Sequence, residues 1–185
     1  MNYMFKTIFI PGNGGGSPKD NWFPYLESEL QKLGIKVINT NFPDAILARK
    51  EFWLPFIKKL DADENTILIG HSSGAVAAMR FAEDNKILGS VLVSPCYTDI
   101  GYENERLSHY YDTPWDWHKI KSNQKWIIQF SSLDDPYIPI SEARFIHQNL
   151  STDYHEYENE GHFGSDKEKV IFPEIVELLK AKLNL

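Results

Sequence analysis

The sequence predicts an α/β fold built on about six mainly parallel strands with helices on both faces. Short runs rich in β-branched and aromatic residues alternate with stretches of helical periodicity, and glycine or proline ends several of them. Strands alternating with helices form right-handed βαβ units, which give this architecture. The chain has 185 residues, the usual size of one domain, and no linker or repeat interrupts it. We therefore expect a single domain over residues 1–185.

Six segments have the composition of strands. The first, FKTIFI, is β-branched and aromatic and ends at Pro11-Gly12, which is typical of a buried strand leading into a turn. The second, IKVINTN, alternates apolar and polar residues, and the last is polar throughout and is expected at a sheet edge. The expected strands span residues 5–10, 35–41, 66–69, 88–93, 126–130 and 153–157.

Helical spacing marks the segments between these strands. Apolar residues of the first helix recur at helical intervals and stop before Gly34. The alanine-rich third helix is a strong helix former suited to close packing. Residues 94–122 show no clear periodicity and are expected to leave the core as an excursion. The expected helices span residues 22–33, 52–60, 75–83, 142–150 and 168–183.

The charge of the chain argues against nucleic-acid binding. The formal net charge is -7, so most of the surface repels a polyanion unless a basic patch reverses the field. The nearest approach to a patch, Lys119, Lys121 and Lys125, lies among tryptophans and is better explained as a solvated face.

Cysteine content and hydropathy predict a cytoplasmic protein that does not enter membranes. Cys96 is the only cysteine, which excludes an internal disulfide and fits a reducing compartment. The apolar run within residues 1–10 ends at Pro11, too early for the core of a signal peptide. No stretch approaches 18 apolar residues, the length that a membrane span needs.

A candidate nucleophile lies between the third strand and the third helix. Residues 70–74 read GHSSG, which matches the pattern G-x-S-x-G. The sharp strand-to-helix turn needs small residues on both sides of the central serine, whose hydroxyl then projects above the sheet at the positive end of the helix. Such a pattern also arises by chance as a plain turn, but the flanking strand and helix favour Ser72 as a nucleophile.

A serine hydroxyl needs a base, and the base needs a group that fixes its tautomer. Asp134 and Asp135 follow the fifth strand, and His162 follows the sixth, so all three lie at strand ends where open α/β sheets place their sites. Each of these residues also has a non-catalytic explanation, since Asp before Pro is common in turns and histidine is common at surfaces. The residues alone favour His162 and Asp135, with Asp134 as a competitor.

The glycine-rich loop at residues 11–16, PGNGGG, is a candidate oxyanion hole. Acyl transfer needs backbone N–H groups aimed at the developing negative charge. We expect these from Ser73 and Asn13. The rival interpretation, a phosphate-binding loop, fails because no Gly-Lys-Ser/Thr follows and Ser17 stands where a dinucleotide fingerprint has its third glycine. No recognisable ligand spacing suggests a metal site.

The excursion contains a group of aromatic residues that suggests a second role. Trp115 and Trp117, with Tyr110 and Tyr111, could wall the site and contact an apolar part of a substrate. The alternative, that these rings pack on the core, is equally compatible with the sequence, because aromatic residues mostly supply buried area.

Taken together, these motifs resemble the group of small serine hydrolases that includes retinoblastoma-binding protein nine and YdeN, within the α/β-hydrolase superfamily. The resemblance extends over nearly the whole chain and is far more specific than G-x-S-x-G alone. It rests on IPGNGGG at 10–16, WLPF at 53–56, IGHSSGAVAAMRFAE at 69–83, ENER at 103–106, PWDW at 114–117, QFSSLDDP at 129–136 and GHF at 161–163.

The resemblance implies a compact α/β-hydrolase with a minimal cap that lacks the first two strands of larger members. It also implies that the nucleophile is Ser72, the acid Asp135 rather than Asp134, and the base His162. Vertebrate members carry a Leu-x-Cys-x-Glu segment that gave the group its name. The matching residues 60–64 read LDADE, with Ala62 in place of the cysteine, so binding to a retinoblastoma-type pocket protein is not expected.

The sequence thus predicts a hydrolase that cleaves a small ester, thioester or amide through an acyl-enzyme, without a cofactor. Its expected partner is a small-molecule acyl substrate. The alternative is a scaffold or interaction module that keeps the fold and is catalytically idle.

Overall fold

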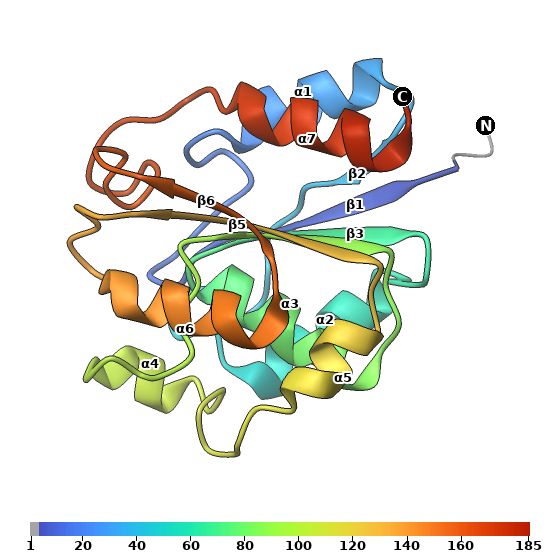
Figure 1. Ribbon diagram of the computed structural model, residues 1–185. Coiled ribbons are helices and arrows are strands. Elements are labelled where there is room, and N and C mark those ends of the chain that lie inside the picture. Colours follow the sequence, from blue (N-terminus) through green and yellow to red (C-terminus); the bar gives the residue numbers. More distant parts are fainter. Residues whose placement is uncertain (1–3) are drawn as a thin grey trace.

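A computed structural model describes residues 4–185 and shows one six-stranded sheet in which every strand pair is parallel. The strands lie in the order β2-β1-β3-β4-β5-β6, which confirms the predicted fold class (Figure 1). The strands are β1 (Lys6–Ile10), β2 (Lys36–Ile38), β3 (Thr66–His71), β4 (Gly89–Val93), β5 (Trp126–Ser132) and β6 (Asp153–Tyr157).

Helices cover both faces of this sheet. In Figure 1, α1 and α7 lie on one face, and α2, α3, α5 and α6 lie on the other. No helix within residues 4–185 combines the length and the apolar character needed to cross a bilayer. The helices are α1 (Phe23–Lys32), α2 (Lys50–Lys59), α3 (Ser73–Asp84), α4 (Glu103–Leu107), α5 (Trp117–Ser122), α6 (Ile140–Leu150) and α7 (Pro173–Leu183).

The largest differences from the sequence-based expectation concern the second strand, the last helix and the excursion. The second strand covers only Lys36–Ile38 instead of residues 35–41. The last helix begins at Pro173 rather than at residue 168, because a residue that precedes proline disfavours helical backbone and proline suits the first helical turn. The excursion over residues 94–122 contains two short helices, α4 and α5, that periodicity did not reveal. Helices of five and six residues are too short to establish a repeating apolar face.

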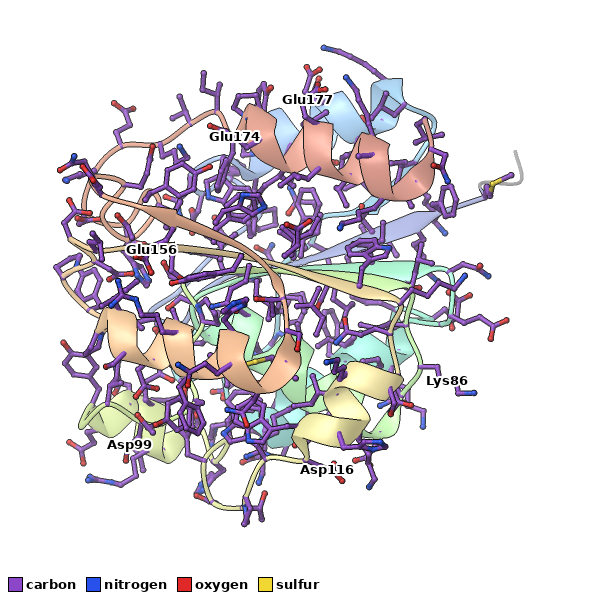
Figure 2. The ribbon with its side chains drawn as sticks, in the orientation of Figure 1. Lys86, Asp99, Asp116, Glu156, Glu174 and Glu177 are labelled. Atoms are coloured by element: carbon purple, nitrogen blue, oxygen red, sulfur yellow. The ribbon has the colours of Figure 1, made fainter. Side chains whose placement is uncertain are left out.

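The core forms two apolar layers, one on each face of the sheet. Successive strand residues point to opposite faces, so Phe9 packs in the layer under α1 and α7, while Ile8 and Ile10 pack in the layer under α3. Both layers contain fully buried side chains, which is why the four central strands, β1, β3, β4 and β5, are mostly apolar, whereas the edge strand β6 is polar. Figure 2 shows charged side chains at the periphery, among them Lys86, Asp99, Asp116, Glu156, Glu174 and Glu177.

Candidate active site

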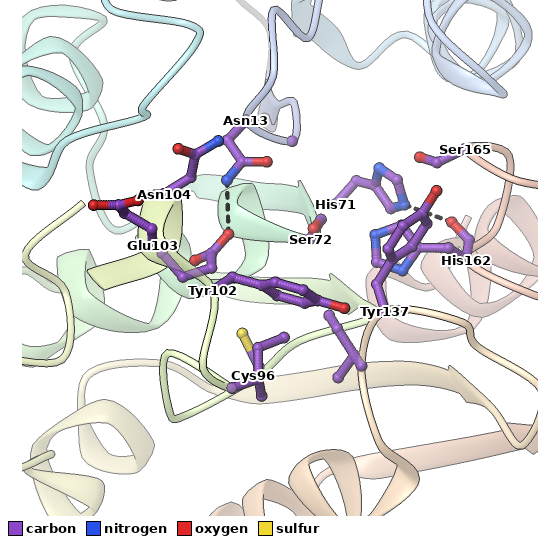
Figure 3. A pocket seen from close by; sticks show the side chains of 14 residues that line it. Asn13, His71, Ser72, Cys96, Tyr102, Glu103, Asn104, Tyr137, His162 and Ser165 are labelled. Carbon is purple, nitrogen blue, oxygen red and sulfur yellow. Dashed lines mark hydrogen bonds between the residues drawn. The ribbon is translucent and has the colours of Figure 1, made fainter. Parts of the chain in front are cut away.

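Loops from the carboxyl ends of five strands, β1, β3, β4, β5 and β6, meet at one cavity of about 540 Å³. The loop after β4 contains α4, and its residues Glu103 and Asn104 lie on the side of the cavity away from His162 and Ser165 (Figure 3). This volume lies within the usual range of small-molecule sites. The cavity is lined by Gly12, Asn13, His71, Ser72, Cys96, Ile100, Tyr102, Glu103, Asn104, Glu105, Tyr137, Ile138, His162 and Ser165.

The turn between β3 and α3 holds Ser72 in a strained backbone conformation. Its φ of 55° and ψ of -123° lie in a region that side-chain-bearing residues seldom adopt. The turn is so tight that it leaves no room for a side chain beside Ser72. A Cβ at Gly70 would lie 2.3 Å from the carbonyl oxygen of Gly74, and a Cβ at Gly74 would lie 2.1 Å from the carbonyl oxygen of Ile10. These clashes explain why glycine stands at both positions, and the result is a serine that lines the cavity.

Asp135 and His162 are brought together from different loops. His162 Nδ1 lies 2.7 Å from Asp135 Oδ2, and both side chains are almost fully buried. The remaining ring nitrogen, Nε2, is therefore left for another partner. No hydrogen bond reaches Ser72 Oγ from any residue in the described range 4–185, although Ser72 and His162 line the same cavity. Such contacts are often long until a substrate binds.

The pKa of Asp135 is lower than usual. Burial acts to raise it, but the hydrogen bond and charge of His162 oppose burial, and the N–H groups of Tyr137 and Ile138 also donate to the carboxylate. The net result is a carboxylate that stays ionised at neutral pH. An ionised Asp135 accepts from Nδ1–H and so fixes the tautomer in which Nε2 of His162 is free to take a proton.

Asp134, the competing acid, faces the backbone of the histidine loop instead of the ring. It accepts hydrogen bonds from Ser132 Oγ at 2.6 Å and from the N–H of Gly161 at 2.8 Å, and it pairs with Lys167. These contacts lower its pKa, with the Lys167 hydrogen bond as the largest cause. Asp134 thus anchors the loop that carries His162.

The backbone of His162 is held on both sides of the residue. Its N–H donates to Asp166 Oδ1 at 2.6 Å, and its carbonyl oxygen lies 2.8 Å from Nε2 of His71. Gly161 adopts a φ of 54°, and a Cβ there would lie 2.3 Å from Asp166. Trp22 Nε1 donates to the next carbonyl, that of Phe163. The imidazole therefore stands on a fixed piece of backbone.

His71 helps to hold the backbone of His162, a role that its position inside the turn of the G-x-S-x-G motif did not indicate. Because a carbonyl only accepts, Nε2 of His71 must carry the proton. Burial, followed by the charge of His162, lowers the pKa of His71 to about 3. The ring is therefore neutral in the folded protein at physiological pH.

We expect His71 to make folding stability depend on pH. The unfolded chain binds a proton at this residue below about pH 6.5, whereas the folded protein binds it only near pH 3. Stability is therefore lost as the pH falls through this window, at up to about 1.4 kcal/mol per pH unit. Urea unfolding at several pH values gives the free energy of unfolding as a function of pH. Between about pH 3 and 6.5 this free energy should depend less on pH for His71→Gln than for wild type. An equal pH dependence of the two proteins would contradict the assignment.

The two residues expected to supply an oxyanion hole lie where their amides are available. Gly14 and Gly15 donate their N–H groups to the carbonyls of Ile46 and Ala45, whereas the N–H of Asn13 reaches no backbone carbonyl within residues 4–185. Ser73 is the first residue of α3, a position whose N–H has no partner within the helix.

Trp115 and Trp117, which we expected near the substrate, are not among the residues that line the cavity. They stack on each other, with ring centroids 5.5 Å apart, and pack against the core. The reason is Arg80 of α3, which lies 3.6 Å over the ring of Trp115 and is only 5% exposed. Arg80 binds the carbonyls of Tyr110, Thr113 and Pro114. This part of the excursion is therefore fastened to α3.

The cavity wall opposite Ser72 comes instead from residues that the sequence did not single out. Tyr102 and Tyr137 stand at its mouth and are about half exposed (Figure 3). Glu105 of α4 and Cys96 lie deeper and are buried. Burial raises the pKa of the Cys96 thiol well above its usual range, so the thiol stays protonated and is a poor nucleophile. The only sequence signal for α4 was its ENER motif.

Comparisons with known proteins agree with this architecture. The family model for serine hydrolases matches residues 7–181. The serine hydrolase RBBP9 of Rattus norvegicus is 41% identical over 181 residues, which cover 96% of this chain and 95% of the rat protein. The crystal structure of the ydeN gene product from Bacillus subtilis is 26% identical and superposes with a TM-score of 0.88, over 98% of this chain and 100% of that one.

A more distant match concerns the fold alone. Est1E from Butyrivibrio proteoclasticus, solved with ferulic acid bound, superposes with a TM-score of 0.70 at 14% identity, over 98% of this chain and 90% of that one. From the family model and the similarity to the rat protein, we conclude that this chain belongs to the serine hydrolase family and has the α/β-hydrolase fold.

Proposed function

We propose that this protein is a carboxylesterase-like hydrolase that cleaves a small ester, thioester or amide through an acyl-enzyme formed on Ser72. The observation that carries the proposal is the 2.7 Å hydrogen bond between His162 and Asp135, beside a strained serine that lines the same cavity. This combination supplies a nucleophile, a base and an acid that orients the base.

In the first half-reaction, Ser72 Oγ bonds to the carbonyl carbon while its proton passes to Nε2 of His162. The N–H groups of Asn13 and Ser73 stabilise the negative charge on the former carbonyl oxygen. The bond to the leaving group then breaks, and His162 gives its proton to that group. Asp135 stays ionised and stabilises the imidazolium.

In the second half-reaction, water repeats these steps. Its oxygen bonds to the acyl carbon while a proton passes to His162, and the carbon–oxygen bond to Ser72 then breaks as His162 returns the proton to Ser72 Oγ. The atoms balance as one water consumed per acyl bond cleaved. Ile100, Ile138 and the rings of Tyr102 and Tyr137 favour a substrate with a modest apolar part.

Pre-steady-state hydrolysis of p-nitrophenyl acetate and butyrate tests the proposal. We expect a burst of about one p-nitrophenol per protein molecule, followed by slower turnover, because the acyl-enzyme accumulates. A parallel series of aminoacyl esters and amides would identify the preferred leaving group. A folded protein with no turnover above buffer on any of these substrates would favour the idle scaffold instead.

A further inference from the structure

A single buried carboxylate connects the two residues that would supply the oxyanion hole. Glu105 is 7% exposed, and its Oε1 accepts hydrogen bonds from Asn13 Nδ2 at 2.7 Å and from Ser73 Oγ at 2.8 Å. Figure 3 shows Asn13 beside the α4 residues Glu103 and Asn104, with the hydrogen bond from Asn13 drawn as a dashed line. Asn13 follows β1, Ser73 follows β3, and Glu105 lies in α4, so one oxygen joins three separate parts of the chain.

The other carboxylate oxygen completes the network. Oε2 accepts from the hydroxyl of Tyr111 at 2.8 Å, and that hydroxyl lies 3.1 Å from Sγ of Cys96. Burying a carboxylate is costly unless donors replace its water, and charge-assisted hydrogen bonds are the strong ones. Three neutral donors meet this need here, and two of the three hydrogen bonds hold the side chains of Asn13 and Ser73 on one oxygen of Glu105.

We propose that Glu105 is a positioning residue that sets the spacing of the Asn13 and Ser73 amides in the oxyanion hole. The inference rests on the proposed function. Backbone hydrogen bonds fix the loop after β1 at Gly14 and Gly15. At Asn13, the side-chain hydrogen bond to Glu105 holds the loop. Oxyanion donors act only at 2.7–3.1 Å from the charge that develops, so a small shift of either amide weakens the stabilisation.

The expected signature is a loss in kcat with KM nearly unchanged, because the oxyanion forms only in the transition state. Removing one such donor lowers kcat by about 10²- to 10³-fold, and we expect Glu105→Ala to approach this loss. Glu105→Gln should lose less, because its amide oxygen still accepts from Asn13 and Ser73 and its NH₂ group can donate to Tyr111. KM for p-nitrophenyl butyrate should change by no more than about threefold if ground-state binding is unaffected.

A second readout is inhibition by phenylboronic acid. The oxygen of Ser72 bonds to boron while its proton passes to His162, and the resulting tetrahedral boronate anion mimics the transition state. Its Ki should rise in parallel with the fall in kcat across wild type, Glu105→Gln and Glu105→Ala. A residue that only supports the fold would lower Tm and the fraction of active sites, as titrated by the burst, but would leave kcat per active site and Ki unchanged.

Glu142 provides a matched control, since it is 8% exposed and accepts three hydrogen bonds from Tyr97 and Thr98. Glu142→Ala should lower Tm without changing Ki.

If Glu105→Ala does not fold, Asn13→Ala and Ser73→Ala each remove one of the two hydrogen bonds to Oε1 of Glu105, and each should raise Ki. If the wild type is active and Ki is the same in the Glu105, Asn13 and Ser73 variants, this inference is wrong and the proposed function stands. An inactive wild type would overturn the proposed function itself.

Discussion

Ser72→Ala is expected to lower kcat by about 10⁴- to 10⁶-fold, as is His162→Ala. Without the hydroxyl there is no acyl-enzyme, and without the imidazole the hydroxyl stays a weak nucleophile. The Ser72→Ala protein should remain folded, because the substitution removes one oxygen that makes no hydrogen bond within the described residues 4–185. Steady-state hydrolysis of p-nitrophenyl butyrate, with Tm measured on the same samples, tests both variants.

Ser73→Ala is the control that separates the two neighbouring serines. It keeps the backbone amide of residue 73 and loses only the bond to Glu105, so we expect a loss of about tenfold or less, a part of the effect of one oxyanion donor. A loss from Ser73→Ala as large as that from Ser72→Ala would mean that the nucleophile was misassigned.

Gly74→Ala is expected to destabilise the protein by at least about 3 kcal/mol, at the upper end of the cost of inserting a methyl group into a packed site. The added Cβ would meet the carbonyl oxygens of Ile10 and Pro11 at 2.1 and 2.5 Å. Both are backbone atoms, so no side chain can rotate to make room. Because the clash falls where β1 meets the turn, the Asn13 loop should move as well. Urea unfolding measures the loss of stability.

Gly34→Ala is a suitable comparison for that experiment. Gly34 has a φ of 73° with no atom within 4 Å of an added Cβ, so its cost comes from the backbone conformation alone, about 1–2 kcal/mol. Activity per folded molecule should be unchanged, because Gly34 precedes β2 and the cavity lies at the opposite, carboxyl ends of the strands. If Gly74→Ala were no more destabilising than Gly34→Ala, the turn would be looser than its geometry indicates.

The sequence predicted the elements of the site where local sterics decide the structure. Gly70 and Gly74 can be inferred because the turn around Ser72 leaves no space for a side chain at either position. The order of strands and helices likewise follows from apolar periodicity, and the fold class was predicted correctly. The bounds of α7 were less accurate, since residues 168–172, which read EKVIF, continue a plausible helical pattern without forming a helix.

Contacts between distant segments were the part that the sequence alone could not determine. Whether the aromatic rings of the excursion face the cavity depends on Arg80, and an arginine in a helix usually indicates an exposed position. The tie from Glu105 to Asn13 spans 92 residues of chain and involves a helix too short to show periodicity. The choice between Asp134 and Asp135 came from the family resemblance, because two adjacent carboxylates at a strand end look alike in sequence.

The most direct test of the central claim is covalent labelling with a fluorophosphonate probe, followed by mass spectrometry of the labelled peptide. Phosphonylation breaks the P–F bond, forms a P–O bond to the nucleophilic serine and releases fluoride and a proton. We predict one adduct per molecule, located on Ser72 and strongly reduced in His162→Ala. A folded wild-type protein that stays unlabelled, or an adduct on another residue, would contradict the account.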